Sequence, residues 1–267
     1  MTRLPLYQVD AFTNTVFAGN PAGVVPLERW LPDATMQAIA AENNLAETAF
    51  FVAQGDDWEL RWFTPTVEVP LCGHATLASA CVISEKLQPG RTRMRFMTKS
   101  GALEVTREGA LLVMDFPARA SESIAPPPGL VAAMGRTPRD VLKSGHMLMC
   151  VYDDAGDVGS LAPDMAGLMT VECFGVIATA PGKGAPPGPA CDFVSRFFAP
   201  RQGIPEDPVT GGAHCTLIPY WAKRLGKPKL FARQISARGG EITCEDKGAR
   251  VLMSGNAVLY LEGTITV

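Results

Sequence analysis

The sequence lacks long apolar runs, and this absence bears first on where the protein is found. No stretch approaches the roughly 18 consecutive apolar residues that a membrane-spanning helix needs. The first ten residues also lack the long apolar core of a secretory signal peptide. We therefore expect a cytoplasmic protein with no membrane partner.

Residues that bind metals or form disulfides are few and scattered. The seven cysteines are odd in number and contain no Cys-x-x-Cys pair, and the three histidines show no ligand spacing. Neither a disulfide framework nor a zinc site is indicated, so we expect reduced thiols and no catalytic metal. The Gly182-Lys183-Gly184 segment also lacks the spacing of a phosphate-binding loop.

An excess of positive charge is absent as well. The formal net charge of −3 provides no basic surface, which argues against nucleic acid as a main partner. Apolar residues at 47% and charged residues at 19% are typical of a folded globular protein. At 267 residues the chain is long enough for two domains with separate cores.

What is present is an internal repeat centred on two glycine-containing helix starts. Residues 206–214 follow an apolar strand-like run and lead into a helical pattern, which predicts a strand, a turn and the first turn of a helix. Residues 61–76 have a similar order of arginine, proline, glutamate and glycine. Gly211 follows Gly73 by 138 residues, and Gly239 follows Gly101 by the same 138. The repeat therefore covers a helix and the strand after it.

The repeat predicts an α+β fold of two similar domains that face each other across a cleft. A helix N-terminus carries about half a positive charge and several unpaired N–H groups, so two of them suit a small carboxylate. The segment 117–128, rich in Ala, Ser and Pro, predicts domains at 1–117 and 118–267, each a mixed sheet around one long helix. The predicted substrate-binding residues are Cys72, Gly73, Ala75, Thr76, Thr210, Gly211, Gly212 and Ala213.

Several short elements are predicted from weaker patterns. Residues 19–23 are predicted as a turn before a short strand at 24–25, and Asp33 as the N-cap of the next helix. Residues 130–134, 140–142 and 164–169 are predicted as short helical pieces, and residues 235–236 as a strand.

Glu47 is the first candidate for acid/base chemistry. It lies in the strand-like run 45–52 among apolar neighbours. Such a setting favours the neutral form of a carboxyl group, which suits a general acid/base that works at carbon near neutral pH. The alternative is an edge-strand glutamate whose carboxylate reaches water, the commoner case.

His74 and Asp207 are the other two catalytic candidates. His74 could donate to a substrate carboxylate or carbonyl, or only bond the backbone near the helix start. Asp207 could orient a substrate amine or hydroxyl, or simply cap the following helix from an Asp-Pro turn. His214 and Cys215 either line the cleft or pack in the core, and packing is favoured for Cys215.

Cys72 supports a rival mechanism. Racemases without cofactors use two acid/base groups on opposite faces of one carbon, and thiols at paired helix N-termini suit that task. The second copy of the repeat has Thr210 where the first has Cys72. Racemisation by two thiols is therefore disfavoured.

Together these motifs resemble the PhzF-type phenazine-biosynthesis isomerase family over most of the chain. The segments that carry the resemblance are Asp10-Ala-Phe-Thr13, Phe17-Ala-Gly-Asn-Pro-Ala22, Asn44-Leu-Ala-Glu-Thr-Ala-Phe50, Phe63-Thr-Pro65 with Glu68, Leu71-Cys-Gly-His-Ala-Thr76 and Glu206-Asp-Pro-Val-Thr-Gly211.

The resemblance implies a fold similar to that of the diaminopimelate epimerases, with two pseudo-symmetric domains, each a barrel-like sheet around a central helix. The last strand would return to the first domain. The implied mechanism is a proton shuttle without cofactor, in which Glu47 takes a proton from one carbon and returns it to another, and His74 and Asp207 match the other polar site positions. A homodimer is also implied.

One position departs from the family pattern. A serine usually follows Asp-Pro-Val-Thr-Gly in the family, and this chain has Gly212. A hydroxyl expected at the substrate is therefore missing. Three hypotheses remain at this point: an isomerase acting on a small cyclic carboxylate, an epimerase that uses Cys72, and a ligand-binding relative without catalysis.

Overall fold

The computed structural model describes residues 1–267, which divide into two units. The first unit comprises residues 1–116 and 252–267, and the second comprises residues 117–251. The last strand thus belongs to the first unit although it follows the second in sequence. None of the helices has both the length and the apolar character needed to cross a membrane.

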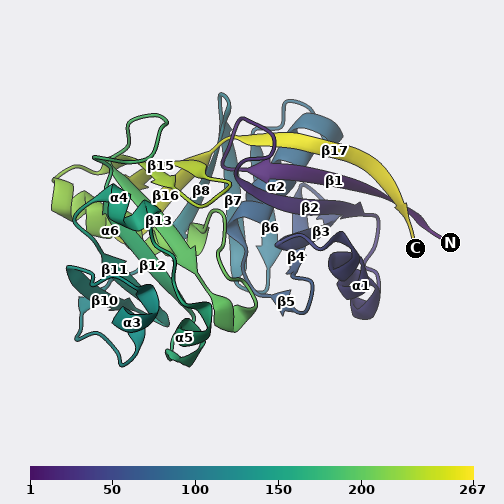
Figure 1. The fold of residues 1–267 in the computed structure, drawn as a ribbon. Helices are drawn as coiled ribbons and strands as arrows, with labels where there is room; N and C mark the ends of the chain where they lie inside the picture. The colour runs from purple at the N-terminus through teal and green to yellow at the C-terminus, as the bar shows by residue number, and fades with distance from the viewer. The chain divides into compact units, whose positions relative to one another are not determined.

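Eight strands of the first unit form a mixed sheet in the order β17–β1–β2–β3–β4–β6–β7–β8. The β2–β3 and β4–β6 pairs are parallel and the others antiparallel, and β5 pairs antiparallel with β4. Figure 1 shows β1 and β17 running together to the two chain ends. The strands are β1 (Arg3–Ala11), β2 (Asn20–Leu27), β3 (Glu47–Gln54), β4 (Asp57–Phe63), β5 (Glu68–Val69), β6 (Arg93–Thr98), β7 (Gly101–Glu108), β8 (Leu111–Pro117) and β17 (Ala257–Thr266).

The second unit repeats this pattern of pairing. Its sheet has the order β10–β11–β12–β13–β14–β15, with parallel pairs at β11–β12 and β13–β14, and β9 pairs with β10. The alternation of antiparallel and parallel pairs matches that of the strands from β1 to β7. The strands are β9 (Glu122–Ser123), β10 (Asp140–Ser144), β11 (Met147–Val151), β12 (Gly175–Pro181), β13 (Phe193–Phe198), β14 (Lys229–Gln234) and β15 (Gly240–Asp246), and β16 (Arg250–Gly255) continues from the second unit into the first.

Each unit contains one buried helix that its sheet covers. In the first unit α2 (Gly73–Val82) is made of small and apolar residues on every side, and every residue from His74 to Val82 is buried. A helix without a polar face must be enclosed, and α2 packs against β1, β2, β3 and β17. A π-helical segment, η1 (Ile83–Leu87), continues it.

In the second unit α6 (Gly211–Leu225) has the corresponding place. Trp221 of this helix stacks on Phe193 with ring centroids 5.6 Å apart, and its Nε1 donates to Thr179 Oγ1 at 3.0 Å. The helix ends at Gly226, whose φ of 67° is a left-handed conformation that glycine adopts readily.

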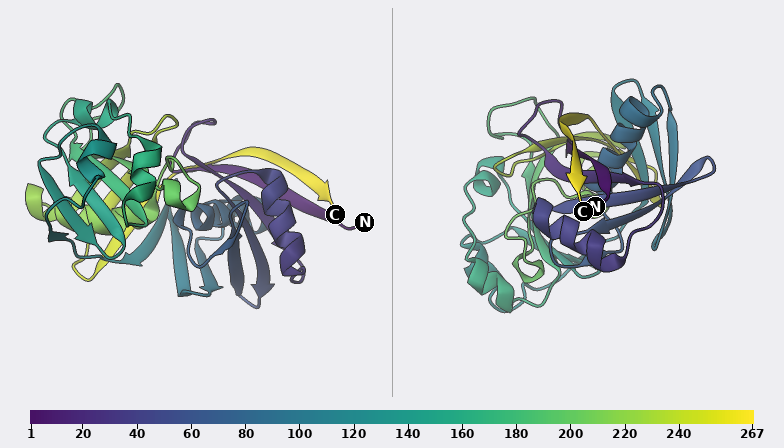
Figure 2. Two further views of the ribbon diagram at one scale, coloured as in Figure 1. Left: turned by 60° about the horizontal axis from the view of Figure 1, so that its bottom comes forward. Right: turned by 90° about the vertical axis from the view of Figure 1, so that its right-hand side faces the viewer.

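The remaining helices are short and lie around the sheets. Helix α1 lies on the first unit near the two chain ends (Figure 2) and contacts β3 and β4. Its Met36 and Ile39 join a core cluster with Leu4, and Ile265 packs against this cluster. These helices are α1 (Asp33–Asn43), α3 (Leu130–Met134), α4 (Ala155–Gly159), α5 (Met165–Thr170) and the 3₁₀ helix η2 (Pro200–Gln202).

Four of the weaker local predictions are wrong. Strand β2 begins at Asn20, inside the predicted turn, and residues 140–142 form part of β10 instead of a helix. Residues 235–236 lie just beyond β14, and Pro32, not Asp33, is the N-cap of α1. For β2 and β10 the run of three to five residues is too short for periodicity to separate strand, turn and helix, and pairing with a neighbouring strand decides.

Candidate active site

The start of α2 presents free backbone donors, as the repeat predicts. Its N-cap residue Cys72 has extended dihedral angles (φ −146°, ψ 113°), and no side chain caps the helix. The N–H groups of the first turn have no partner within a helix, so they lie where an anion would be bound. The Thr76 hydroxyl donates to the Cys72 carbonyl at 2.6 Å. Thr76 is fully buried, so this hydrogen bond holds the first turn of the helix on its buried side.

Three sequence-predicted residues meet beside this helix start: Glu47, Cys72 and His74, here called the Glu47–Cys72–His74 cluster. His74 Nε2 lies 3.2 Å from Glu47 Oε2, although the two atoms are not aligned for a linear hydrogen bond. His74 Nδ1 lies 3.5 Å from Cys72 Sγ. Glu47 is brought here because it is the first residue of β3, and α2 begins beside that end of the strand.

Asn20 completes the surroundings of His74. Its Nδ2 lies 3.2 Å from His74 Nδ1, and the contact is buried. Asn20 is the first residue of β2, which runs parallel to β3 with Ala22 opposite Glu47, so both polar residues enter from the same ends of neighbouring strands. An amide donating to Nδ1 leaves the proton of a neutral imidazole on Nε2, toward the Glu47 carboxylate.

The pKa values of the thiol and the imidazole in the cluster are shifted by different causes. Burial and the charge of Glu47 raise the pKa of the Cys72 thiol to about 11, so the thiol is protonated near neutral pH. Burial lowers the pKa of the His74 imidazole, but the contacts of the ring with Cys72 and Glu47 outweigh burial and leave this pKa above its ordinary value. A proton held at His74 faces the Glu47 carboxylate.

An arginine–glutamate pair fixes the segment that leads into α2. Arg61 donates from Nε and Nη2 to the two carboxylate oxygens of Glu68, at 2.8 and 2.9 Å. These hydrogen bonds lower the pKa of Glu68 to about 2, although burial opposes them. The guanidinium also lies over the rings of Trp30 and Phe63. A bidentate pair of this kind holds the two side chains in one geometry and is also a strong hydrogen-bonded contact.

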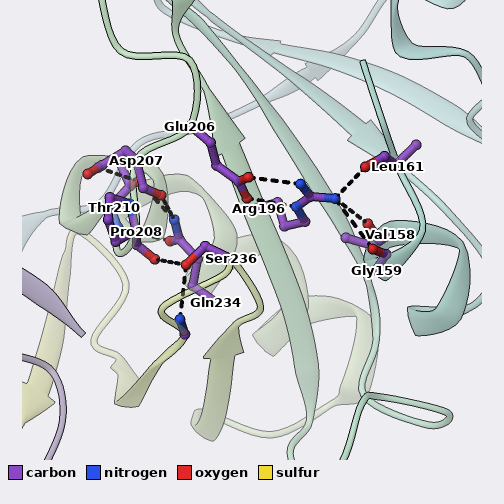
Figure 3. Close-up of polar contacts among 11 residues, drawn as sticks. Val158, Gly159, Leu161, Arg196, Glu206, Asp207, Pro208, Thr210, Gln234 and Ser236 are labelled. Carbon is purple, nitrogen blue, oxygen red and sulfur yellow. Dashed lines mark hydrogen bonds and ion pairs between the residues drawn. The ribbon is translucent and has the colours of Figure 1, made fainter. Parts of the chain in front are cut away.

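The second unit carries the same pair at the corresponding place (Figure 3). Arg196 donates from Nε and Nη2 to Glu206 at 2.7 and 2.8 Å, and its guanidinium lies over the ring of Phe198. Nη1 also donates to the carbonyls of Val158 and Leu161. The repeat seen in the sequence therefore extends to the side-chain geometry before each buried helix.

Asp207 lies in a hydrogen-bonded loop before α6. Its Oδ2 accepts from Thr210 Oγ1 at 2.6 Å, so the aspartate orients Thr210, which is the N-cap residue of α6. Gln234 holds the same loop: its Oε1 accepts from the Thr210 N–H at 2.9 Å, and its Nε2 donates to the Asp207 carbonyl at 2.7 Å. Ser236 Oγ donates to the Pro208 carbonyl (Figure 3).

The helix start of α6 presents the amides of Gly211, Gly212 and Ala213 without a side-chain cap. A Cβ on Gly212 would meet only the end of the Met147 side chain, at 3.7 Å, so the backbone does not demand glycine there. His214 and Cys215 are both buried. His214 Nδ1 donates to the Thr210 carbonyl at 2.8 Å, and its ring lies 6.0 Å from that of Phe193, so it packs in the core.

Two residues of these sites were not singled out from the sequence. Asn20 lies within the segment 17–22 that carries the family resemblance, so a signal was present, but the segment was predicted as a turn. Gln234 has no signal in the sequence. Its role arises because β14 brings its last residue beside the loop 207–210.

Comparison with known proteins places the chain in a family. The model of the phenazine biosynthesis-like proteins, PhzC-PhzF, matches residues 9–263. A Pseudomonas aeruginosa protein named as an uncharacterized isomerase is 52% identical over 262 residues, with 98% of both chains covered. A solved structure of a PhzF-family protein from Enterococcus faecalis has a TM-score of 0.94 at 44% identity and covers 100% of both chains. The chain belongs to the PhzF family of phenazine biosynthesis-like proteins.

The fold is also that of a wider group. A hydroxyproline epimerase from Agrobacterium vitis matches with a TM-score of 0.60 at 11% identity, covering 99% of this chain and 91% of that one. At this identity the likeness concerns the fold alone. The predicted α+β, epimerase-like fold is thus confirmed, and family and fold together support an isomerase role.

Proposed function

We propose that this protein is an isomerase that moves a proton between two carbons of a small, cyclic carboxylate, with Glu47 as the acid/base. The observation that carries the proposal is the position of Glu47: its carboxylate lies beside an uncapped helix start and 3.2 Å from His74 Nε2. A carboxylate at this place can reach a carbon of a ligand whose anionic group is held by the amides of residues 73–75.

The proposed reaction has two proton transfers. The Glu47 carboxylate accepts a proton from one carbon, and the electron pair of that C–H bond enters the substrate π system. The proton of the resulting Glu47 carboxyl group exchanges with solvent, and the group then donates a proton to a second carbon of the same ligand, so the double bond moves and no net oxidation occurs. His74 Nε2 lies 3.2 Å from the Glu47 carboxylate and can hold a proton beside it between turnovers. These steps balance without a cofactor.

The geometry favours glutamate over thiol as the acid/base. Burial and the Glu47 charge raise the pKa of Cys72 to about 11, so little thiolate is available as a base near neutral pH. The second copy of the repeat provides Thr210 and no second thiol. An epimerase that depends on Cys72 is therefore less well supported than a Glu47 shuttle.

Solvent exchange followed by NMR tests the proposal directly. The protein is incubated with a panel of cyclic and amino carboxylates in deuterium oxide, and deuterium incorporation at carbon is followed. Wild type should incorporate deuterium into at least one ligand, and Glu47→Gln should abolish it while ligand binding persists. Glu42→Gln changes an exposed carboxylate of α1 and serves as the control.

The outcomes distinguish the three hypotheses. Full exchange by Glu47→Gln would reject the proposal, and loss of exchange only in Cys72→Ala would favour the epimerase. Ligand binding by wild type without exchange anywhere in the panel would favour a relative that binds but does not catalyse. The sequence-based prediction that Asp207 also takes part is tested in the same assay with Asp207→Asn.

A further inference from the structure

The Glu47–Cys72–His74 cluster contains three kinds of metal donor in one place. One ligand atom from each residue, a carboxylate oxygen, a thiol sulfur and an imidazole nitrogen, lies within 4.8 Å of the other two. These are the donors that Zn²⁺ takes in proteins, and three protein ligands with one open position is the arrangement of an accessible zinc site. The spacing of the histidines alone did not indicate this, because Glu47 arrives from a separate strand.

We propose that the Glu47–Cys72–His74 cluster binds a Zn²⁺ ion, and that the bound ion inhibits the enzyme by occupying the carboxylate of Glu47. The ion is an exogenous inhibitor in this proposal and takes no part in the reaction. Only the inhibition rests on the proposed function, since binding of the ion depends on the three donors alone.

The separations in the cluster are close to those of a tetrahedral site. With bond lengths of about 2.0 to 2.3 Å, neighbouring ligand atoms lie roughly 3.2 to 3.8 Å apart. His74 Nε2 and Glu47 Oε2 are already 3.2 Å apart. Cys72 Sγ lies 3.5 Å from the other ring nitrogen, Nδ1, and one ligand atom from each of the three residues lies within 4.8 Å of the other two, so rotation of the Cys72 side chain toward Glu47 is needed to complete the site.

The second ring nitrogen of His74 is supported in the manner of metal-bound histidines. When Nε2 binds an ion, Nδ1 carries the proton and needs an acceptor. The Asn20 side-chain amide lies 3.2 Å from Nδ1 and supplies its oxygen after rotation about its terminal bond. Asn20 thus serves either state of the imidazole.

Charge and burial also favour an ion here. The side chains of His74 and Glu47 are only 6% and 13% exposed, and Cys72 is buried. Binding forms a zinc–sulfur and a zinc–nitrogen bond and releases to solvent the thiol proton and, from the imidazolium form, the proton on His74 Nε2. The ion, one thiolate, one carboxylate and a neutral imidazole then sum to zero charge. A buried site that is neutral overall avoids the cost of an uncompensated charge.

Metal binding is measured on the tag-free, reduced protein by calorimetry with Zn²⁺ and by absorption with Co²⁺, which reports thiolate ligation. Wild type should bind one ion and develop the thiolate–cobalt band. Cys72→Ser should lose the band and weaken Zn²⁺ binding by more than about tenfold. Cys81→Ser, which changes a buried thiol of the same helix outside the cluster, should behave as wild type.

Several results would overturn the inference. They are the absence of stoichiometric binding by folded wild type, a band that survives in Cys72→Ser, and a band that is lost in Cys81→Ser. Thermal melts establish that each variant is folded. In the deuterium-exchange assay Zn²⁺ should inhibit wild type and a chelator should restore exchange, and exchange that is unchanged at saturating Zn²⁺ would overturn the inhibitory role. Failure of the isomerase proposal appears separately, as no exchange in metal-free protein.

Discussion

His74 Nε2 lies 3.2 Å from Glu47 Oε2, at the point where β3 begins and α2 starts. We expect His74→Gln to lower the deuterium-exchange rate by about 10²-fold, because the carboxylate loses the cation or N–H group that stabilises it. His146→Gln removes an exposed histidine and should leave the rate unchanged. A His74→Gln enzyme with the wild-type rate would show that the imidazole is only structural.

Gln234 is predicted to position the loop 207–210. Gln234→Leu leaves the Thr210 N–H and the Asp207 carbonyl without this partner inside the protein, and we expect a loss of about 1 to 3 kcal/mol in the free energy of unfolding, measured with urea. Gln202→Leu, at an exposed position, is the control. The deuterium-exchange rate of Gln234→Leu should also fall below that of Gln202→Leu. The two rates are measured under conditions where both variants are fully folded, so that unfolding does not account for the difference.

Gly212 can be replaced by serine at little structural cost. A Cβ there meets only the Met147 side chain at 3.7 Å, and glycine is a poor helix former, so we expect Gly212→Ser to be as stable as wild type or more stable by up to about 1 kcal/mol. The added hydroxyl should increase exchange with cyclic amino carboxylates.

Gly212→Ala separates the hydroxyl from the added carbon. It should match the serine variant in thermal stability and match wild type in substrate preference. Equal preference profiles for the serine and alanine variants would show that a hydroxyl at this position does not contact the ligand.

His214 predicts a pH dependence of stability. Burial lowers its pKa to about 4 from an ordinary 6.5, although the hydrogen bond to the Thr210 carbonyl opposes the shift. Between these values the unfolded chain binds a proton that the folded protein does not, so stability is complete above pH 6.5 and falls as the pH drops toward 4. Between these pH values the free energy of unfolding should fall by about 3 kcal/mol because of His214.

Urea unfolding of wild type and His214→Asn across this range measures that contribution. The asparagine retains a donor for the Thr210 carbonyl but does not titrate, so its stability should fall less steeply with decreasing pH. His146→Asn should keep the wild-type slope. Parallel curves for wild type and His214→Asn would contradict a buried neutral histidine at this position.

The repeat was the most informative part of the sequence. Glycines at a constant offset predicted two copies of a strand, turn and helix, and the two sheets share their order of parallel and antiparallel pairs. The pairs Arg61–Glu68 and Arg196–Glu206 lie in the repeated segments, but sequence alone does not show that they form bidentate contacts.

What sequence could not provide were contacts made by distant short segments. Asn20 reaches His74 only because β2 begins earlier than its Gly-Asn-Pro-Ala-Gly composition suggested, and Gln234 reaches Asp207 only through the parallel pairing of β13 and β14. Residues 140–142 became a strand because β11 pairs with them. The roles of Glu47, His74 and Asp207 in a reaction stay predictions until the variants are measured.

The matching arginine–glutamate pairs have a practical consequence. Each unit has an arginine–glutamate pair in the segment before its buried helix. A substitution in one unit can therefore be compared with the equivalent substitution in the other. Arg61→Lys and Arg196→Lys disturb equivalent scaffolding, yet only the first lies on the side of Glu47, Cys72 and His74. Comparing the two variants therefore separates a loss of stability, which both should show, from a loss of activity, which only Arg61→Lys should show in addition.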